Sequence, residues 1–239
     1  MININKIYND DCLEGLKKIE SNSVDMVLSD PPYFLLVNSY VGVRGEGYHR
    51  RTLADTSILK GYFERIFEEL ERVLKPQGVY YIFCDAQSYP IFYQVMFPYC
   101  KYVRLLIWDK LVSYNGYTWR HQHECIAWGE KEETPRINTG DGDILKCRGV
   151  LQKARNHPAE KPVELLKKLI LKHKQSAEML VLDPYMGSGS VAVASKECGV
   201  NFIGFELDKT HCETANQRAN GEIQVPLAIN KKEDYGLPP

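Results

Sequence analysis

The chain has 239 residues, of which 44% are hydrophobic and 26% are charged, and its formal net charge is −1. These values are those of an ordinary globular protein with one substantial core. No apolar run approaches the roughly 20 residues that a membrane span needs, and the start of the chain lacks the pattern of a signal peptide. The seven cysteines form no C-x-x-C pair. That argues against a disulfide framework or a zinc site, and favours reduced thiols in a cytoplasmic protein.

Strand-like and helix-like segments alternate along the chain, which predicts an α/β fold with a mainly parallel sheet. The predicted strands cover residues 4–9, 24–29, 79–84, 102–108, 123–128, 179–182 and 201–205. The predicted helices cover residues 12–19, 58–74, 87–97, 162–173 and 191–197. The strand at 123–128 is the candidate for an antiparallel strand. We expect a single domain over 1–225 and a C-terminal tail over 226–239.

Two segments show no clear period. Residues 34–57 are rich in glycine and arginine and are long for a loop inside a compact domain, where such loops are usually lids or binding loops. Residues 130–156 are polar and irregular. Local clusters of cations can bind phosphates even when the net charge is near zero, although solvated loops remain the alternative. The candidate cations are Arg44, Arg50, Arg51, Lys146, Arg148 and Arg155.

The tetrapeptide Asp30-Pro31-Pro32-Tyr33 follows the apolar run at 24–29. The two prolines fix φ and remove two N–H donors, so nearby carbonyls are left as acceptors. Asp30 adds a charged acceptor and Tyr33 adds a stacking face. This combination suits a flat substrate that carries an aromatic amine, although a simple proline turn after a strand is the alternative.

A second motif lies far downstream, where the strand at 179–182 runs into Asp183-Pro184-Tyr185-Met186-Gly187-Ser188-Gly189-Ser190. Gly187 and Gly189 permit positive φ and close backbone approach, and the following helix presents unpaired N–H groups to a ligand. The next strand ends at Glu206, where a nucleoside-binding fold accepts hydrogen bonds from ribose hydroxyls. The third glycine of the dinucleotide fingerprint is missing, so a dehydrogenase is not favoured.

Together these residues resemble the amino-methylating DNA methyltransferases that use S-adenosylmethionine. They are most similar to the beta class, in which D-P-P-Y precedes the cofactor loop. The resemblance runs from Asn9 to Glu206. Glutamine and RNA-guanine methyltransferases usually carry asparagine in place of Asp30, and their cofactor loop comes first. The resemblance implies a class I methyltransferase fold in permuted order: a Rossmann-like, seven-stranded, mainly parallel sheet with helices on both faces.

The resemblance also implies the chemistry. Asp30 and the Pro31 carbonyl would accept hydrogen bonds from both N–H groups of the target amine, within a catalytic motif that includes Pro32. Tyr33 would stack on the base. The expected reaction moves a methyl group from S-adenosylmethionine to the N6 amine of an adenine flipped out of a specific duplex DNA sequence. No metal is required.

For the cofactor, the resemblance implies a set of binding residues drawn from several segments. They are Asp11, Asp30, Lys161, Asp183, Tyr185, Gly187, Ser188, Gly189, Ser190 and Glu206. Asp11 would contact the adenine ring, or would instead cap the helix that follows it. Lys161 would approach the cofactor carboxylate, or would instead be solvated.

For the DNA, the resemblance implies that residues 34–57 close over the flipped base and that 130–156 form a small target-recognition region. The latter is short for that role. Recognition is therefore shared with the 34–57 loop, supplied by a second copy in a homodimer, or limited to a short site, and these alternatives stay open. Duplex DNA is the expected partner, and a cognate restriction endonuclease is left open. A prokaryotic or phage-encoded cytoplasmic protein is expected.

Three other functions remain as alternatives. Cytosine N4 methylation uses the same site chemistry, but the cytosine enzymes more often carry serine at the position of Asp30. A catalytically silent binding member of the fold is disfavoured by the intact Asp30 and glycine loop. A nucleotide-dependent oxidoreductase is the third alternative.

Overall fold

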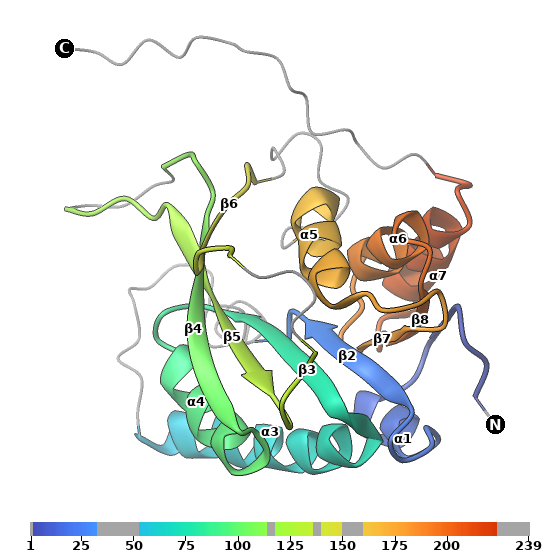
Figure 1. Cartoon of the computed structure of the whole chain (residues 1–239), viewed down its shortest axis with the longest axis horizontal. Helices are drawn as coiled ribbons and strands as arrows, with labels where there is room; N and C mark the ends of the chain where they lie inside the picture. The colour runs from blue at the N-terminus through green and yellow to red at the C-terminus, as the bar shows by residue number, and fades with distance from the viewer. Residues whose placement is uncertain (1, 33–52, 114–117, 136–139, 150–159, 224–239) are drawn as a thin grey trace, which may run out of the picture.

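The computed structural model describes residues 2–32, 53–113, 118–135, 140–149 and 160–223, which form a central sheet covered by helices (Figure 1). The strands are β1 (Lys6–Tyr8), β2 (Val24–Ser29), β3 (Leu74–Cys84), β4 (Tyr102–Asp109), β5 (His123–Glu130), β6 (Ile144–Lys146), β7 (Leu180–Asp183) and β8 (Asn201–Phe205). The helices are α1 (Cys12–Leu16), α3 (Leu53–Val73), α4 (Tyr89–Met96), α5 (Val163–His173), α6 (Ser190–Glu197) and α7 (Lys209–Ala219), with a 3-10 turn η1 (Phe97–Tyr99) after α4.

In the part of the chain that the structure describes, the strands lie in the order β1-β8-β7-β2-β3-β5-β4-β6. β5 runs antiparallel to β3 and β4, and the other neighbouring pairs are parallel. The α/β class, the mainly parallel sheet and the antiparallel strand near 123–128 are therefore confirmed.

The predicted number of seven strands was wrong, because the described residues form an eight-stranded sheet. The additional strand β6 lies inside the 130–156 region and pairs Leu145 with Trp108 of β4. Only Leu145 of its three residues is buried, and so short a segment shows too little alternation to be recognised as a strand. Helix α7 was also missed, since its sequence is largely polar and only Cys212, Ala215, Arg218 and Ala219 are buried.

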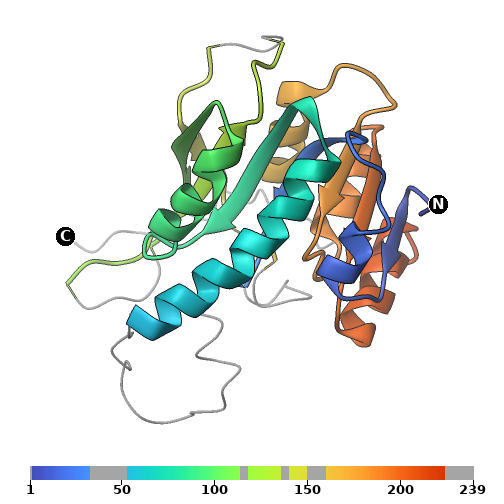
Figure 2. The same cartoon turned by 90° about the horizontal axis from the view of Figure 1, so that it is seen from below.

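Helices cover both faces of the sheet, as predicted. α1, α3 and α4 pack on one face, where Phe63 and Phe92 are buried with their rings 4.7 Å apart. α5, α6 and α7 pack on the other face through residues such as Leu166 and Ala192 (Figures 1 and 2). Within the described residues, no helix is both long and apolar enough to cross a bilayer.

Strand β2 lies between β7 and β3 and positions the site. Val24, Met26, Val27 and Leu28 are completely buried, because a parallel strand in the middle of such a sheet is covered on both faces. The strand order runs outward from here, through β7, β8 and β1 on one side and through β3, β5, β4 and β6 on the other. Open α/β sheets bind ligands at the carboxyl ends of the strands near such a reversal of order.

Candidate active site

Three acids that the sequence singled out lie at one edge of the sheet. Asp30 follows the last residue of β2, Asp183 ends β7 and Glu206 follows β8. β7 pairs in parallel with both β2 and β8, so the carboxyl ends of these three strands meet at the same edge. The fold therefore gathers the D-P-P-Y start and the glycine loop, which are far apart in the sequence.

Asp30 is a strongly desolvated acid. Its Oδ2 accepts a hydrogen bond of 2.5 Å from Lys161 Nζ, while the buried Oδ1 has no hydrogen-bond partner among the described residues. Burial raises the pKa of Asp30 to about 6, against the lowering effect of the Lys161 ammonium. Pro31 is buried and Pro32 is half-buried, whereas Tyr33 lies outside the described residues. The site thus contains a carboxylate with one oxygen held and one available.

Asp183 is tied to the start of the glycine loop and to β2. Its Oδ1 accepts hydrogen bonds from Ser29 Oγ at 2.6 Å and from the Tyr185 backbone N–H at 3.0 Å. Burial, together with the charges of Asp30 and Glu206, raises the pKa of Asp183 to about 7. The edge is therefore acidic and would favour a cationic ligand.

The glycine loop has the backbone that its sequence predicted. Gly187 and Gly189 have φ angles of 53° and 87°, in the left-handed region where side chains are strained. A Cβ at Gly189 would lie 2.9 Å from Ala215 of α7, so this glycine is required for packing. At Gly187 a Cβ would come no nearer than 4.0 Å to Tyr185 O, and this part of the loop is open.

A buried ion pair anchors the same loop to α7. Arg218 Nη1 donates hydrogen bonds to the Ser188 carbonyl at 2.7 Å and to Ser188 Oγ at 2.8 Å. Arg218 Nη2 lies 2.5 Å from Glu160 Oε1, and the two side chains are 0% and 2% exposed. This pair could not be predicted from the sequence, because Arg218 lies on α7, the helix that was missed.

Glu206 is held in place by backbone donors. Its Oε2 accepts from the Gly187 N–H and its Oε1 from the Asp208 N–H, both at 2.8 Å. Asn9 donates from Nδ2 to the Glu206 carbonyl at 2.9 Å and so fixes the backbone at this point. Among the described residues, the Glu206 carboxylate is therefore oriented by backbone N–H groups and not by a cation.

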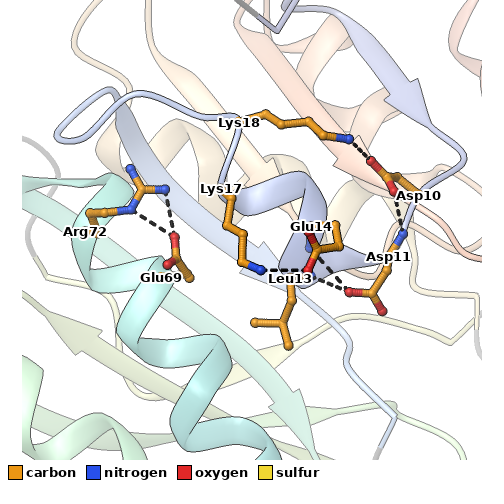
Figure 3. Close-up of polar contacts among 8 residues, drawn as sticks. All are labelled: Asp10, Asp11, Leu13, Glu14, Lys17, Lys18, Glu69 and Arg72. Atoms are coloured by element: carbon orange, nitrogen blue, oxygen red, sulfur yellow. Dashed lines mark hydrogen bonds and ion pairs between the residues drawn. The ribbon is translucent and has the colours of Figure 1, made fainter.

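Asp11 caps helix α1, the alternative that the sequence left open (Figure 3). Its Oδ1 accepts from the Leu13 N–H at 2.9 Å and from the Glu14 N–H at 3.4 Å. β1 ends at Tyr8, so Asp11 does not end the strand itself. Contact with the cofactor adenine stays a prediction for this exposed residue.

Of the six DNA-binding candidates, Lys146 and Arg148 are described and both are exposed. β6 pairs in parallel with β4, which runs in the same direction as β3, so Lys146 lies at the same edge of the sheet as Asp30. The other four candidates, Arg44, Arg50, Arg51 and Arg155, lie outside the described residues, as does most of the 34–57 loop.

Solved structures show the class to which this fold belongs. The chain superposes on the M1.HpyAVI–SAM complex with a TM-score of 0.67 and 22% identity, covering 90% of this chain and 98% of that one. On the cytosine-N4-specific PvuII DNA methyltransferase the TM-score is 0.69 at 14% identity, covering 90% and 89%. The fold is that of the class I methyltransferases.

Sequence comparison gives the family. The chain is 28% identical to the type II methyltransferase M2.DpnII of Streptococcus pneumoniae, over 92% of this chain and 91% of that one. It is 26% identical to the type II methyltransferase M.HinfI of Haemophilus influenzae, over 90% and 68%. A model of the N6/N4 methyltransferase family, described as DNA methylase, matches residues 24–217. The chain belongs to this family of S-adenosylmethionine-dependent DNA methyltransferases.

The ion pair behind the glycine loop yields a stability prediction. Arg218→Met leaves Glu160 buried without this partner and should destabilise the fold by about 3–5 kcal/mol. The free energy of unfolding in urea measures this, with Arg104→Met as the matched control, because Arg104 is exposed on β4 and lies over the rings of Tyr102 and Trp128 at 5.7 and 5.9 Å. Equal losses in the two variants would contradict the anchoring role of Arg218.

Proposed function

We propose that this enzyme methylates the N6 amine of adenine in duplex DNA and that Asp30 and Pro31 are the hydrogen-bond acceptors for that amine. The observation that carries the proposal is Asp30 itself, which follows the central strand and has a buried Oδ1 without a hydrogen-bond partner among the described residues. An acid at this position also favours adenine over cytosine, by the family resemblance. Tyr33 would stack on the base.

The acceptors act on the nucleophile. The lone pair of an exocyclic amine is delocalised into the ring, so the nitrogen is a poor nucleophile. Asp30 Oδ1 and the Pro31 carbonyl would each accept one N–H, which favours a pyramidal nitrogen with its lone pair directed out of the ring plane. Positioning and electrostatics are then the main contributions of the protein.

The residues at the edge fit S-adenosylmethionine. Ser190 Oγ, at the start of α6, is a buried hydroxyl without a partner among the described residues, and the loop is open at Gly187. Glu206 would accept from the ribose hydroxyls, and the acids Asp30 and Asp183 complement cationic groups. When bound, the cofactor supplies an electrophilic methyl group on a sulfonium.

DNA would approach from the same edge. A base inside a duplex cannot present its amine to a buried carboxylate, so the target adenine would flip out. Lys146 and Arg148 are exposed cations at this edge that would contact phosphates. A homodimeric state, a cognate restriction endonuclease and a cytoplasmic location stay predictions from the family resemblance.

The direct test is methyl transfer to unmethylated duplex DNA of mixed sequence, with the nucleosides identified by mass spectrometry. The wild type should form N6-methyladenine, and Asp30→Asn should lower the rate by about 10²- to 10³-fold, because one charged acceptor is lost. Glu197→Gln is the matched control, since Glu197 is 46% exposed and ends α6, the helix that leads away from the glycine loop. N4-methylcytosine as the product would overturn the proposed base.

The raised pKa of Asp30 predicts a pH dependence. The ionised carboxylate is a much stronger acceptor for the amine than the protonated acid, so kcat/KM should fall as the pH drops through about 6. An exposed aspartate would keep its charge down to about pH 4. Activity that stays level down to that lower pH, in protein shown by circular dichroism to be folded, would contradict the assignment.

Glu206 gives a prediction for cofactor affinity. Glu206→Ala removes a charged acceptor and also the anchor of the Gly187 N–H, so the Kd for S-adenosylmethionine should rise about 10- to 100-fold. Isothermal titration calorimetry measures the Kd. Glu213→Ala should leave it unchanged, because Glu213 is exposed on α7 and pairs with Lys209. The same Kd in both variants would remove Glu206 from the binding site.

A further inference from the structure

Four charged side chains of alternating sign form a row that ends at Asp30. Lys161 Nζ lies 2.5 Å from Asp30 Oδ2 and 3.3 Å from Glu124 Oε2. Lys110 Nζ lies 2.5 Å from Glu124 Oε1. The four side chains are 7–18% exposed. They come from the end of β2, the segment before α5, the strand β5 and the residue after β4.

The row occupies only one oxygen of Asp30. Lys161 holds Oδ2, and the buried Oδ1 has no hydrogen-bond partner in the described part of the chain. The Lys161 ammonium also lies 5.3 Å from the centre of the Phe83 ring, which limits its movement on that side. These contacts restrict rotation of the Asp30 carboxylate and leave Oδ1 available as an acceptor.

We propose that Lys161 and Glu124 are positioning residues for methyl transfer: Lys161 fixes one oxygen of Asp30 so that the other faces the target amine, and Glu124, held by Lys110, fixes Lys161. This role rests on the proposed function of Asp30 as the acceptor for the amine. It differs from the contact with the cofactor carboxylate that the sequence suggested for Lys161.

Stability alone is a poor reason for such a row. Removing two charges from water usually offsets much of their attraction, and apolar side chains of similar volume often stabilise a fold as well or better. A row of four charges beside the reactive edge therefore indicates a functional requirement. The reaction requires Asp30 to be ionised and held in one orientation.

The two positioning residues shift the pKa of Asp30 in opposite directions. Burial raises the pKa of Asp30, Lys161 lowers it and Glu124 raises it. The titratable groups that face Asp30 are Lys161, Glu124, Lys110, Asp183 on β7 and Cys84 on β3. Loss of Lys161 should therefore shift the titration of Asp30 upward in pH, and loss of the Glu124 charge should shift it downward.

The experiment is a pH titration of the Asp30 carboxyl by ¹³C NMR, in the full chain labelled at the aspartate carboxyl carbon. Asp30→Asn assigns the resonance. Lys161→Met should raise the titration midpoint by about one pH unit or more, and Glu124→Gln should lower it. Lys75→Met is the matched control, because Lys75 pairs with Asp25 at 2.7 Å near the start of β2, and it should leave the Asp30 midpoint unchanged.

Kinetics test the same residues in the reaction. Lys161→Met should lower kcat by about 10²-fold with a smaller change in KM, and the acid limb of kcat should move in the same direction as the NMR midpoint. Lys161→Arg, which keeps the charge, should return the acid limb toward that of the wild type. A purely structural lysine would leave the acid limb in place.

An Asp30 midpoint that does not move in Lys161→Met overturns the proposal. If that variant unfolds, Glu124→Gln keeps the lysine and decides the question by the direction of its shift. The NMR titration needs neither DNA nor cofactor. A wild type that forms no N6-methyladenine would therefore overturn the proposed base, while the titration would still show whether Lys161 and Glu124 control Asp30.

Discussion

A largely desolvated carboxylate at the end of the central strand, that of Asp30, is the constraint on which this site depends. Burial disfavours the charged form of Asp30, yet the charged form is the one that accepts from an amine. The ammonium of Lys161 opposes the effect of burial, and Glu124 and Lys110 extend the row to the antiparallel part of the sheet. Residues from other parts of the fold therefore stabilise the ionised form of Asp30, which its position at the end of β2 disfavours.

The acids at this edge are stabilised in different ways, and the difference matches their proposed roles. Glu206 is held by backbone N–H groups, which cannot change their charge, and so offers a fixed acceptor. Asp183 is held by a hydroxyl and one N–H, and its pKa is raised to about 7. Asp30, by contrast, accepts its hydrogen bond from the ammonium of Lys161. The three carboxylates at this edge are thus held by three different kinds of hydrogen-bond donor.

The features that could be predicted from the sequence are those that a local residue pattern determines. The bounds of β2 were predicted without error, since a strand covered on both faces is a continuous apolar run, and the glycine loop followed from its two glycines. Contacts between distant segments leave no periodicity in a sequence. The pairing of Lys161 with Asp30 and the anchoring of Ser188 by Arg218 could therefore not be read from it. Strand β6 and helix α7 were missed because neighbouring elements, and not their own composition, stabilise them.

The anchoring of the glycine loop by α7 has a consequence for how the protein is made. The loop at 187–189 depends on Arg218 and packs against Ala215, both of which follow every strand of the described sheet. Chains are synthesised from the amino terminus, and domains begin to fold during synthesis. The acid of the D-P-P-Y motif is thus made early, but the loop lacks its support until α7 has emerged from the ribosome. A nascent chain that has formed its sheet is still an incomplete enzyme.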